Sequence, residues 1–414
     1  MSRRWTIFAL ASANFFLSLF YRSTNAVIAP QLLHDLSLNT KDLGLLSGAF
    51  FYGFALMQIP ITLLLDKVGP RRLMSILSLF SVSGALIFSF SETLTTGVIA
   101  RFLLGMGMAC HLMGTLKLLT LWFGPLRFAT LSGIVLSIGT MGNIAATSPF
   151  VLLVGEVGWR SGMRLIAVIN FVLLAAFYVI VRDTPHQNGA SSVAGDRQAA
   201  PGLSQTFSHV RLLFRNRSYW IISLGTFTNY GVFAAFQTLW AGPYLMEVMG
   251  LSPIVAGNLI FLISLGYLIA PPISGILSDR ILKTRKWIVL WGLVIYSFLT
   301  AAIAILSPGT YTWVFALLFF CFGFFRATAS LMYTQIKELM PLGMAGTAMT
   351  GINFFTMIGP AFFLHGIGWF MQTFYPHAPR GAEAFRGALL VCAFCLAVVS
   401  LVYLFTRDTK GQSP

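Results

Sequence analysis

The sequence predicts an all-α integral membrane protein, and two observations support that prediction. The first is composition: 57% of the 414 residues are hydrophobic and only 9% are charged, whereas a soluble domain carries about 25% charged residues. The second is a series of apolar runs of about 20 residues or more, the length that an α-helix needs to cross a bilayer core. With so few charges, most of the folded surface must face lipid.

Twelve apolar runs are expected to be transmembrane helices, and one long polar stretch divides them into two sets of six. The runs lie at 6–33, 44–65, 73–91, 95–122, 129–154, 163–181, 219–245, 254–278, 287–306, 312–336, 347–373 and 387–406. The polar stretch is rich in Ser, Ala, Gly and Gln, which is typical of a linker. We therefore expect an N-terminal six-helix bundle at 1–182, a cytoplasmic linker at 183–217 and a C-terminal six-helix bundle at 218–414.

The distribution of Lys and Arg predicts the orientation of the chain. If the N-terminus is cytoplasmic, most of the Lys and Arg residues outside the spans lie on the cytoplasmic side, as the positive-inside rule requires. Both termini are therefore expected in the cytoplasm. The net charge of +15 has the same origin, so it does not indicate binding to nucleic acid.

The two halves repeat each other at the ends of their helices. An acid followed by basic residues comes after the second span, at 66–72, and again after the eighth, at 279–286. The sixth span ends in Val-Arg-Asp-Thr at 181–184, and the twelfth ends in Thr-Arg-Asp-Thr at 406–409. Two parallel six-helix repeats are a known plan of secondary transporters, so the two bundles are expected to be pseudo-symmetric.

At these positions the chain resembles the major facilitator superfamily. The loop at 62–72 is similar to the signature G-x-x-x-D-x-x-G-R-R, with Thr62 in place of the first glycine and Pro70 inserted before the basic pair. Residues 101–109 read R-F-L-L-G-M-G-M-A, similar to the family's R-x-x-x-G-x-G-x-A. The resemblance implies two bundles that work by alternating access, with helices 1, 4, 7 and 10 lining a central cavity.

The resemblance also implies a gating role for the charged loops. In the family, such charges join the two halves in the outward-facing state and separate when the cytoplasmic side opens, so that each state has contacts that the other lacks. The alternative is that these charges only enforce the topology. The residues expected to act as gates are Asp66, Arg71, Arg72, Asp279 and Arg280.

The charges within the spans are all basic. They are Arg22, Arg101, Lys117 and Arg326, and every Asp and Glu lies in a loop or at a helix end. A cation near the middle of the bilayer costs about 2.5–3.5 kcal/mol, so it is expected to face an aqueous cavity and to have a partner. Since no carboxylate within the spans can be that partner, a bound anion is the obvious remaining one.

Arg22 and Arg326 are the main candidates for binding the anion. Arg22 lies near the middle of the first span, with Tyr21 and Asn25 beside it, and Arg326 lies at a similar depth in the tenth. A guanidinium offers a planar fork that matches a carboxylate or a phosphate. The alternative for Arg22 is a bond to backbone carbonyls at a helix break.

Arg101 and Lys117 in the fourth span are further candidates. They lie about 160° apart around an ideal helix, so both cannot point into one cavity unless the helix bends. A structural role for Arg101 is as well supported as substrate contact. Lys117 precedes the cytoplasmic loop, and its long side chain could extend to the membrane interface instead.

Polar and aromatic side chains complete the predicted site. In the seventh span, Asn229, Gln237 and Trp240 recur at helical spacing and share a face, and Tyr230 adjoins it. Tyr333 in the tenth span is a further candidate. Packing between helices is the alternative explanation for this face.

No metal, cofactor or enzymatic site is expected. Cys392 and Cys395 form a C-x-x-C motif without a second pair or a nearby His, which is more consistent with apolar packing. His111 and His365 lie within spans, where a cavity histidine could carry a proton, but we expect structural hydrogen bonds. The sequence contains no recognisable nucleophile–base pair or metal cluster.

The sequence therefore predicts a monomeric secondary transporter of the plasma membrane, the inner membrane of a bacterium, that moves a small organic anion by alternating access. Its pattern of buried bases without buried acids resembles the organic-anion members of the superfamily. Exchangers that use phosphate often carry a basic residue in helix 7, which this chain lacks. The coupling is left open between symport, antiport and uniport.

Two alternatives remain at the level of sequence. One is an exporter of amphipathic drugs or metabolites, including carboxylate siderophores, which the aromatic face of the seventh span favours. The absence of the drug-antiporter pattern from helix 5 opposes it, since Gly139 is followed by Thr140 rather than proline. The other is a membrane ligand sensor that keeps the transporter fold without moving its ligand.

Overall fold

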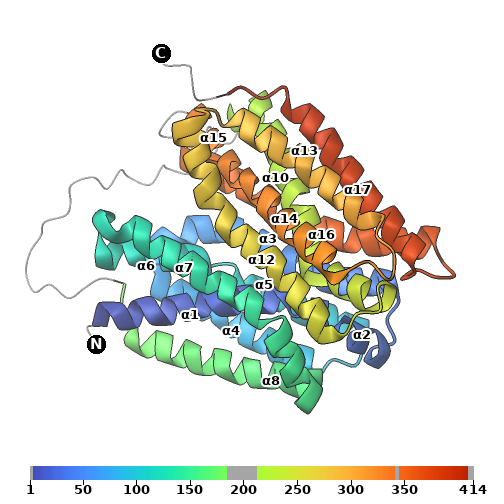
Figure 1. Ribbon diagram of the computed structural model, residues 1–414. Helices are drawn as coiled ribbons and strands as arrows, with labels where there is room; N and C mark the ends of the chain where they lie inside the picture. The colour runs from blue at the N-terminus through green and yellow to red at the C-terminus, as the bar shows by residue number, and fades with distance from the viewer. Residues whose placement is uncertain (1–2, 184–211, 341–344, 409–414) are drawn as a thin grey trace, which may run out of the picture.

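The computed structural model describes residues 3–183, 212–340 and 345–408, and within these ranges every regular element is a helix (Figure 1). In the described ranges, nine helical segments are long and apolar enough to cross a membrane. The prediction of an all-helical membrane fold is confirmed at this level. Most of the predicted linker, residues 184–211, lies outside the described residues.

The helices up to residue 180 form the group that we call the N-terminal half. Within it, α1 packs on α7, α5 packs on both α3 and α4, and α4 packs on α8. The elements are α1 (Arg3–Ser23), α2 (Asn25–Asp35), α3 (Thr40–Val68), α4 (Pro70–Ser89), α5 (Leu94–Met108), α6 (His111–Phe123), α7 (Pro125–Ala145) and α8 (Ser148–Ile180).

The helices from residue 217 onward form the C-terminal half. Here α10 packs on α16, α12 on α14, and α13 on α17. Short π-helical turns (η1 to η3) and one 3-10 turn (η4) interrupt the long helices. The elements are α10 (Arg217–Ala235), η1 (Phe236–Trp240), α11 (Ala241–Pro243), η2 (Tyr244–Val248), α12 (Pro253–Ile276), η3 (Leu277–Ile281), α13 (Lys286–Ala304), α14 (Thr312–Ala327), η4 (Thr328–Ser330), α15 (Leu331–Leu339), α16 (Ala345–Phe374) and α17 (Ala382–Tyr403).

Side-chain caps, proline and glycine mark the starts of several helices. Asn39 and Asp42 form a capping box at the start of α3, in which each side chain bonds the backbone N–H of the other. Proline begins α4, α7 and α12, where its missing N–H is not needed. Gly69 and Gly124, which precede α4 and α7, have φ of 86° and 70°, a conformation that glycine adopts readily.

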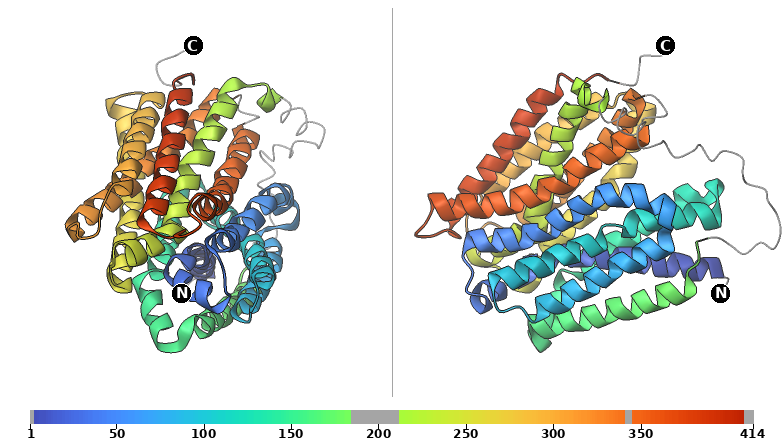
Figure 2. Two further views of the ribbon diagram at one scale, coloured as in Figure 1. Left: turned by 90° about the vertical axis from the view of Figure 1, so that its right-hand side faces the viewer. Right: turned by 180° about the vertical axis from the view of Figure 1, so that it is seen from behind.

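The two halves meet at one end of the molecule and spread apart toward the other. Figures 1 and 2 show the helices diverging toward the end where both termini lie. At the opposite end, α2 packs against η1 and α11, and α8 packs against α12. Ser148 of α8 donates a hydrogen bond of 2.8 Å to Asn258 of α12 across this contact. We call this the closed end and the other the termini end.

Glycines permit the close approach of the two halves at the closed end. A Cβ atom on Gly242 of α11 would lie 1.9 Å from the carbonyl oxygen of Ala26 in α2. A Cβ on Gly44 of α3 would lie 2.5 Å from the carbonyl oxygen of Leu364 in α16. Small residues let helix backbones touch in this way within a membrane.

Several predicted spans differ from the helices observed. The fourth is divided into α5 and α6, the seventh is interrupted by η1 and η2, and the tenth is interrupted by η4. The first, predicted at 6–33, consists of α1 and α2, which meet at Thr24. The fifth, predicted at 129–154, ends at Ala145, and α8 begins at Ser148 with Pro149 in its first turn. The prediction of its end was wrong because the apolar composition continues across the break. Within α8, the helix is kinked at Gly158, which has φ of 76°.

Candidate functional site

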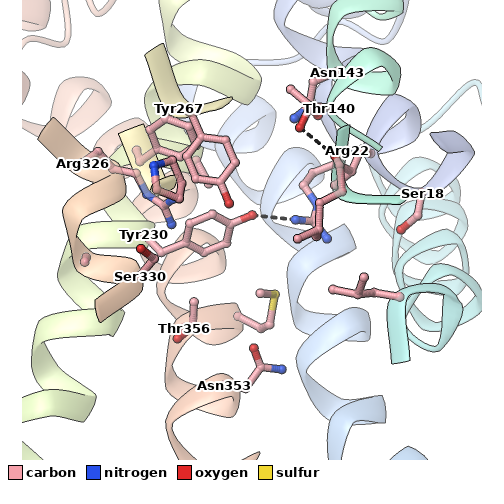
Figure 3. Close-up of a pocket in the computed structure, with 18 of the residues that line it drawn as sticks. Ser18, Arg22, Thr140, Asn143, Tyr230, Tyr267, Arg326, Ser330, Asn353 and Thr356 are labelled. Carbon is pink, nitrogen blue, oxygen red and sulfur yellow. Dashed lines mark hydrogen bonds between the residues drawn. The ribbon is translucent and has the colours of Figure 1, made fainter. Parts of the chain in front are cut away.

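A cavity of about 590 Å³ lies between the two halves, and both contribute to its lining. Its residues come chiefly from α1, α3, α6 and α7 on one side and from α10, η1, α12, η4 and α16 on the other, with Arg326 from α14. Figure 3 shows the polar side chains facing one another across it. Pockets of this volume hold small organic molecules, and here the lining is largely apolar with a few polar groups.

Arg22 reaches the cavity from the last turn of α1, where the negative end of the helix dipole favours a cation. Its Nη1 donates a hydrogen bond of 2.5 Å to the hydroxyl of Tyr230 in α10 (Figure 3). Its guanidinium carbon lies 4.9 Å from the ring centre of Phe54 and 5.6 Å from that of Phe51. The residue is 8% exposed and its Nε has no hydrogen-bond partner. The guanidinium is therefore buried and only partly satisfied.

Arg326 enters from the other half in the same structural context, the last turn of α14. Its guanidinium carbon lies 4.6 to 4.7 Å from the ring centres of Tyr230, Phe233 and Tyr267. Such contacts stabilise a desolvated cation by about 2 kcal/mol, but an aromatic face cannot replace the acceptors that guanidinium N–H groups need. Its Nε also has no hydrogen-bond partner.

Among the described residues, no carboxylate of the lining offsets the positive charge of the cavity. No Asp or Glu is found among the lining residues in the described part of the chain. Within the same ranges, neither Arg22 nor Arg326 forms an ion pair with a carboxylate. Since charges interact strongly in a site of low dielectric, a ligand that brings negative charge and hydrogen-bond acceptors would satisfy both groups.

A polar cluster on α15, α16 and α3 lines the cavity beside the arginines. The hydroxyl of Tyr333 lies 3.0 Å from Oδ1 of Asn353 and 2.9 Å from Oγ1 of Thr356. Nδ2 of Asn353 donates a hydrogen bond of 2.8 Å to Oε1 of Gln58, which belongs to the N-terminal half. This cluster therefore links the two halves, as the bond between Arg22 and Tyr230 does.

The predicted polar face of the seventh span lies partly in the cavity. Asn229, Tyr230 and Gln237 line it. Nε2 of Gln237 donates a hydrogen bond of 2.8 Å to Ser264 of α12, so one of its donors is engaged by the protein. Trp240 is 1% exposed and is not among the lining residues; its ring packs against that of Phe385.

Some predicted substrate-binding residues lie outside the cavity lining. Besides Trp240, they are Tyr21, Asn25, Arg101 and Lys117. Arg101 is 1% exposed and donates a hydrogen bond of 3.0 Å to the carbonyl oxygen of Tyr21, so it joins α5 to α1. Asn25 donates a hydrogen bond of 2.8 Å to Ser47 of α3, and Lys117 is half-buried in α6. The first three are placed where they hold helices of the N-terminal half together.

The predicted gating residues lie toward the termini end. They are Asp66, Arg71, Arg72, Asp279 and Arg280. Arg71 donates hydrogen bonds of 2.7 and 3.0 Å to the carbonyl oxygen of Tyr178, and Asp279 pairs with Arg285 at 2.8 Å. Both contacts are made within one half. Arg72 and Arg280 are exposed, and the side chain of Asp66 lies outside the described part of the structure.

The acid that ends each half has a role that sequence reasoning missed. Oδ1 of Asp183 accepts a hydrogen bond of 2.7 Å from the backbone N–H of Arg71, at the start of α4. Oδ1 of Asp408 accepts one of 3.0 Å from the backbone N–H of Arg285, at the start of α13. The N-cap residues of these two helices supply no side-chain acceptor themselves. The motif repeated at the ends of the sixth and twelfth spans contains both acids and could have indicated this shared capping role.

Several cavity residues were also missed. Each is an isolated polar residue in an otherwise apolar stretch, so helical periodicity could not separate it from packing. These residues include Ser18, Gln58, Thr140, Asn143, Tyr267 and Thr356. His111, by contrast, lies outside the lining and bonds Ser78 at 3.1 Å.

Comparison with known proteins gives consistent matches. The sequence profile of the Major Facilitator Superfamily matches residues 10–363 and, in a second match, residues 222–414. The chain is 27% identical to a probable sulfoacetate transporter of Cupriavidus necator, over 87% of this chain and 86% of that protein. It is 25% identical to a probable L-galactonate transporter of Escherichia coli, over 93% and 85% of the two chains. It is 23% identical to a probable hexose phosphate transport protein of Chlamydia trachomatis, over 95% and 89%.

Solved structures share the fold. A bacterial homologue of the human lysosomal transporter Spinster, in an inward-facing and unoccupied conformation, matches with a TM-score of 0.79. The two chains are 17% identical, and the match covers 97% of this chain and 96% of that one. A D-xylose–proton symporter matches with a TM-score of 0.74 at 14% identity and covers all of both chains.

Proposed function

The chain belongs to the major facilitator superfamily, and we propose from this premise that it is a secondary transporter of a small organic anion. The observation that supports the proposal is the pair of guanidinium groups, Arg22 and Arg326, which two different halves bring to one cavity that no described carboxylate lines. A buried cation needs a partner. An anion that bridges both arginines would be that partner for the cation of each half at once.

The relatives are consistent with this substrate class. Their names refer to a sulfonated carboxylate, a sugar acid and a sugar phosphate, all of which are organic anions. Their common chemistry is an acidic group with several acceptor oxygens, which suits the fork of a guanidinium. The polar cluster of Gln58, Tyr333 and Asn353 would offer hydrogen bonds to the rest of such a molecule.

We propose twelve membrane spans in two six-helix bundles, with the boundaries of the observed helices, so that the fifth span ends at Ala145, and with both termini in the cytoplasm. The interrupted helices then count as single spans: α1 with α2, α5 with α6, α10 with η1 to η2, and α14 with α15. The closed end would face outward, so that the structure corresponds to an inward-facing state of an alternating-access cycle. The predicted gating charges would join the halves in the opposite state. We also propose that the protein is a monomer in a bacterial inner membrane; its similarity to bacterial transporters is consistent with that membrane.

A ligand screen tests the proposal. Purified protein is heated with sulfonates, sugar acids, sugar phosphates, neutral sugars and amphipathic cations, since a ligand that binds the folded state raises the unfolding temperature. We expect stabilisation by an anion. Arg22→Ala or Arg326→Ala should weaken that anion's binding at least about 30-fold, because each leaves a buried charged group without its partner.

The controls separate binding from folding. Arg386→Ala removes a cation whose side chain is 53% exposed, and it should leave the stabilisation unchanged. Arg22→Lys keeps the charge without the planar fork and should bind with intermediate affinity. Stabilisation only by neutral or cationic compounds, or an unchanged anion response in both alanine variants, would contradict the proposal.

A further inference from the structure

The bond between Arg22 and Tyr230 connects the two halves inside the substrate cavity. Arg22 belongs to α1 and Tyr230 to α10, so any movement of one half against the other must lengthen or break it. The bond is short, at 2.5 Å, and both residues are buried, with exposures of 8% and 9%. It therefore lies where the halves must come together around a substrate.

Tyr230 contacts both arginines at once. Its hydroxyl oxygen accepts the hydrogen bond from Arg22, and its ring lies 4.7 Å from the guanidinium carbon of Arg326. A phenol oxygen bonded to a guanidinium N–H occupies the position that an oxygen of a bound acid would take. One half of the protein thus supplies an acceptor to the cation of the other half.

We infer that Tyr230 is a positioning residue that takes the place of the substrate in the empty carrier. The inference rests on the proposed function, because it assigns the role of Tyr230 within the same anion site. When an anion binds Arg22, the hydroxyl is displaced while the ring remains against Arg326. When the anion leaves, the hydroxyl returns to Arg22.

The consequence concerns the return step of the transport cycle. To change sides, the carrier must pass through a state in which the cavity is closed to water on both sides. Without a substrate, Arg22 would then be a buried cation lacking an acceptor, which is costly. The Tyr230 hydroxyl removes much of that cost, so the empty carrier can change sides. The protein should therefore perform net transport rather than obligatory exchange.

Tyr230→Phe tests this role, because it keeps the ring against Arg326 and removes only the hydroxyl. Proteoliposomes are loaded with labelled sulfoacetate, L-galactonate or glucose 6-phosphate, which represent three classes of anion. Exchange is measured against the same unlabelled anion outside, and net efflux is measured into anion-free buffer. Exchange uses only the loaded carrier, whereas net efflux also requires the empty carrier to return.

We expect the ratio of net efflux to exchange to fall about tenfold or more in the variant, the effect of one hydrogen bond to a charged group. Tyr244→Phe is the matched control. It removes an equally buried phenol bond of the C-terminal half, from Tyr244 to the carbonyl oxygen of Ile303 at 2.7 Å, away from the cavity. Its ratio of exchange to net efflux should equal that of the wild type.

Any other result of the flux measurements would contradict either the role of Tyr230 or the proposed function. If exchange and net efflux fall together in Tyr230→Phe, the hydroxyl is a substrate ligand and not a replacement for the substrate. If neither changes, the hydroxyl has no part in the return of the empty carrier. If the wild type exchanges none of the three anions, the proposed function fails, and the inference fails with it.

Discussion

The contact between Gly242 and Ala26 should control the balance between the two states of the carrier. These residues join α11 to α2 at the closed end, and a Cβ on Gly242 would lie 1.9 Å from the carbonyl oxygen of Ala26. Real Cβ contacts are hardly ever shorter than 3.0 Å. Gly242→Ala would therefore force the two backbones apart by more than an ångström, and the obstructing atom is backbone, which cannot rotate away.

The size of the effect follows from the cost of overpacking. Inserting a methyl group into a close-packed contact costs about 1–3 kcal/mol. The contact joins the two halves, so the cost falls on the state in which this end is closed. A bias of that size changes the ratio of the two states about 5- to 150-fold. Gly242→Ala should thus shift the protein toward the state that is open at this end.

Spin labels at the closed end can measure this shift. In a background with the four native cysteines replaced, His34→Cys and Arg386→Cys place one label on each half, at side chains that are 90% and 53% exposed. Pulsed electron resonance should show a longer distance population in Gly242→Ala. The population of the wild type should stay mainly at the shorter distance.

A second glycine provides the matched control. A Cβ on Gly53 of α3 would lie 2.2 Å from the carbonyl oxygen of Phe102 in α5, and both helices belong to the N-terminal half. Gly53→Ala should therefore lower thermal stability without changing the label distances. Equal distances in Gly242→Ala and the wild type, or equal shifts in the two glycine variants, would refute the assignment of this contact to one state.

Two further predictions concern the acids at the helix ends. Asp183→Ala and Asp408→Ala each remove the acceptor at the start of α4 or α13, so each should lower the free energy of unfolding by about 0.5–2 kcal/mol. The losses should add in the double variant because the sites lie in different halves; unchanged melting in detergent would contradict the capping role. The indole N–H of Trp159, then His34 and Arg160, lower the pKa of Asp35 from its ordinary value of 3.8. The stability that this lowered pKa contributes is complete above pH 3.8 and is lost as pH falls through the lowered pKa. An Asp35→Asn variant should therefore show a weaker acid-induced fall in melting temperature than the wild type. Identical acid profiles of the two proteins would contradict this prediction.

The membrane fold could be predicted because it depends on long apolar runs. The charged centre of the site could be predicted because single charged residues stand out in those runs. An apolar run of the right length has few structures available in lipid. A lone Arg22 or Arg326 in such a run is costly anywhere except at a cavity or a partner. The positions of these lone charges within apolar runs therefore led to the two guanidinium groups that the structure places in one cavity.

The partners of these arginines could not be predicted from the sequence. Arg22 and Tyr230 are 208 positions apart, and no periodicity relates positions in different bundles. Tyr267 and Gln58 are single polar residues among apolar ones, a pattern equally typical of packing. Tyr21 adjoins Arg22 in the sequence, but neighbouring residues of a helix point about 100° apart. It is fully buried and lies outside the cavity lining.

Arg101 shows why an intramembrane cation does not by itself identify a binding site. It is 1% exposed, and its Nε lacks a hydrogen-bond partner just as those of Arg22 and Arg326 do. Its other contacts, however, are a carbonyl oxygen and the rings of Phe50 and Phe88, all within one half. Arg22 and Arg326 differ in that their contacts include a residue shared between them, Tyr230, and one of these contacts crosses between the halves. A cation whose partner belongs to the other moving body must exchange that partner whenever the bodies separate. The charge of the substrate then decides not only whether it binds, but also whether the loaded carrier can close. A neutral solute of the same shape could not displace the Tyr230 hydroxyl from Arg22. The site should therefore select its substrate by negative charge before it selects by shape.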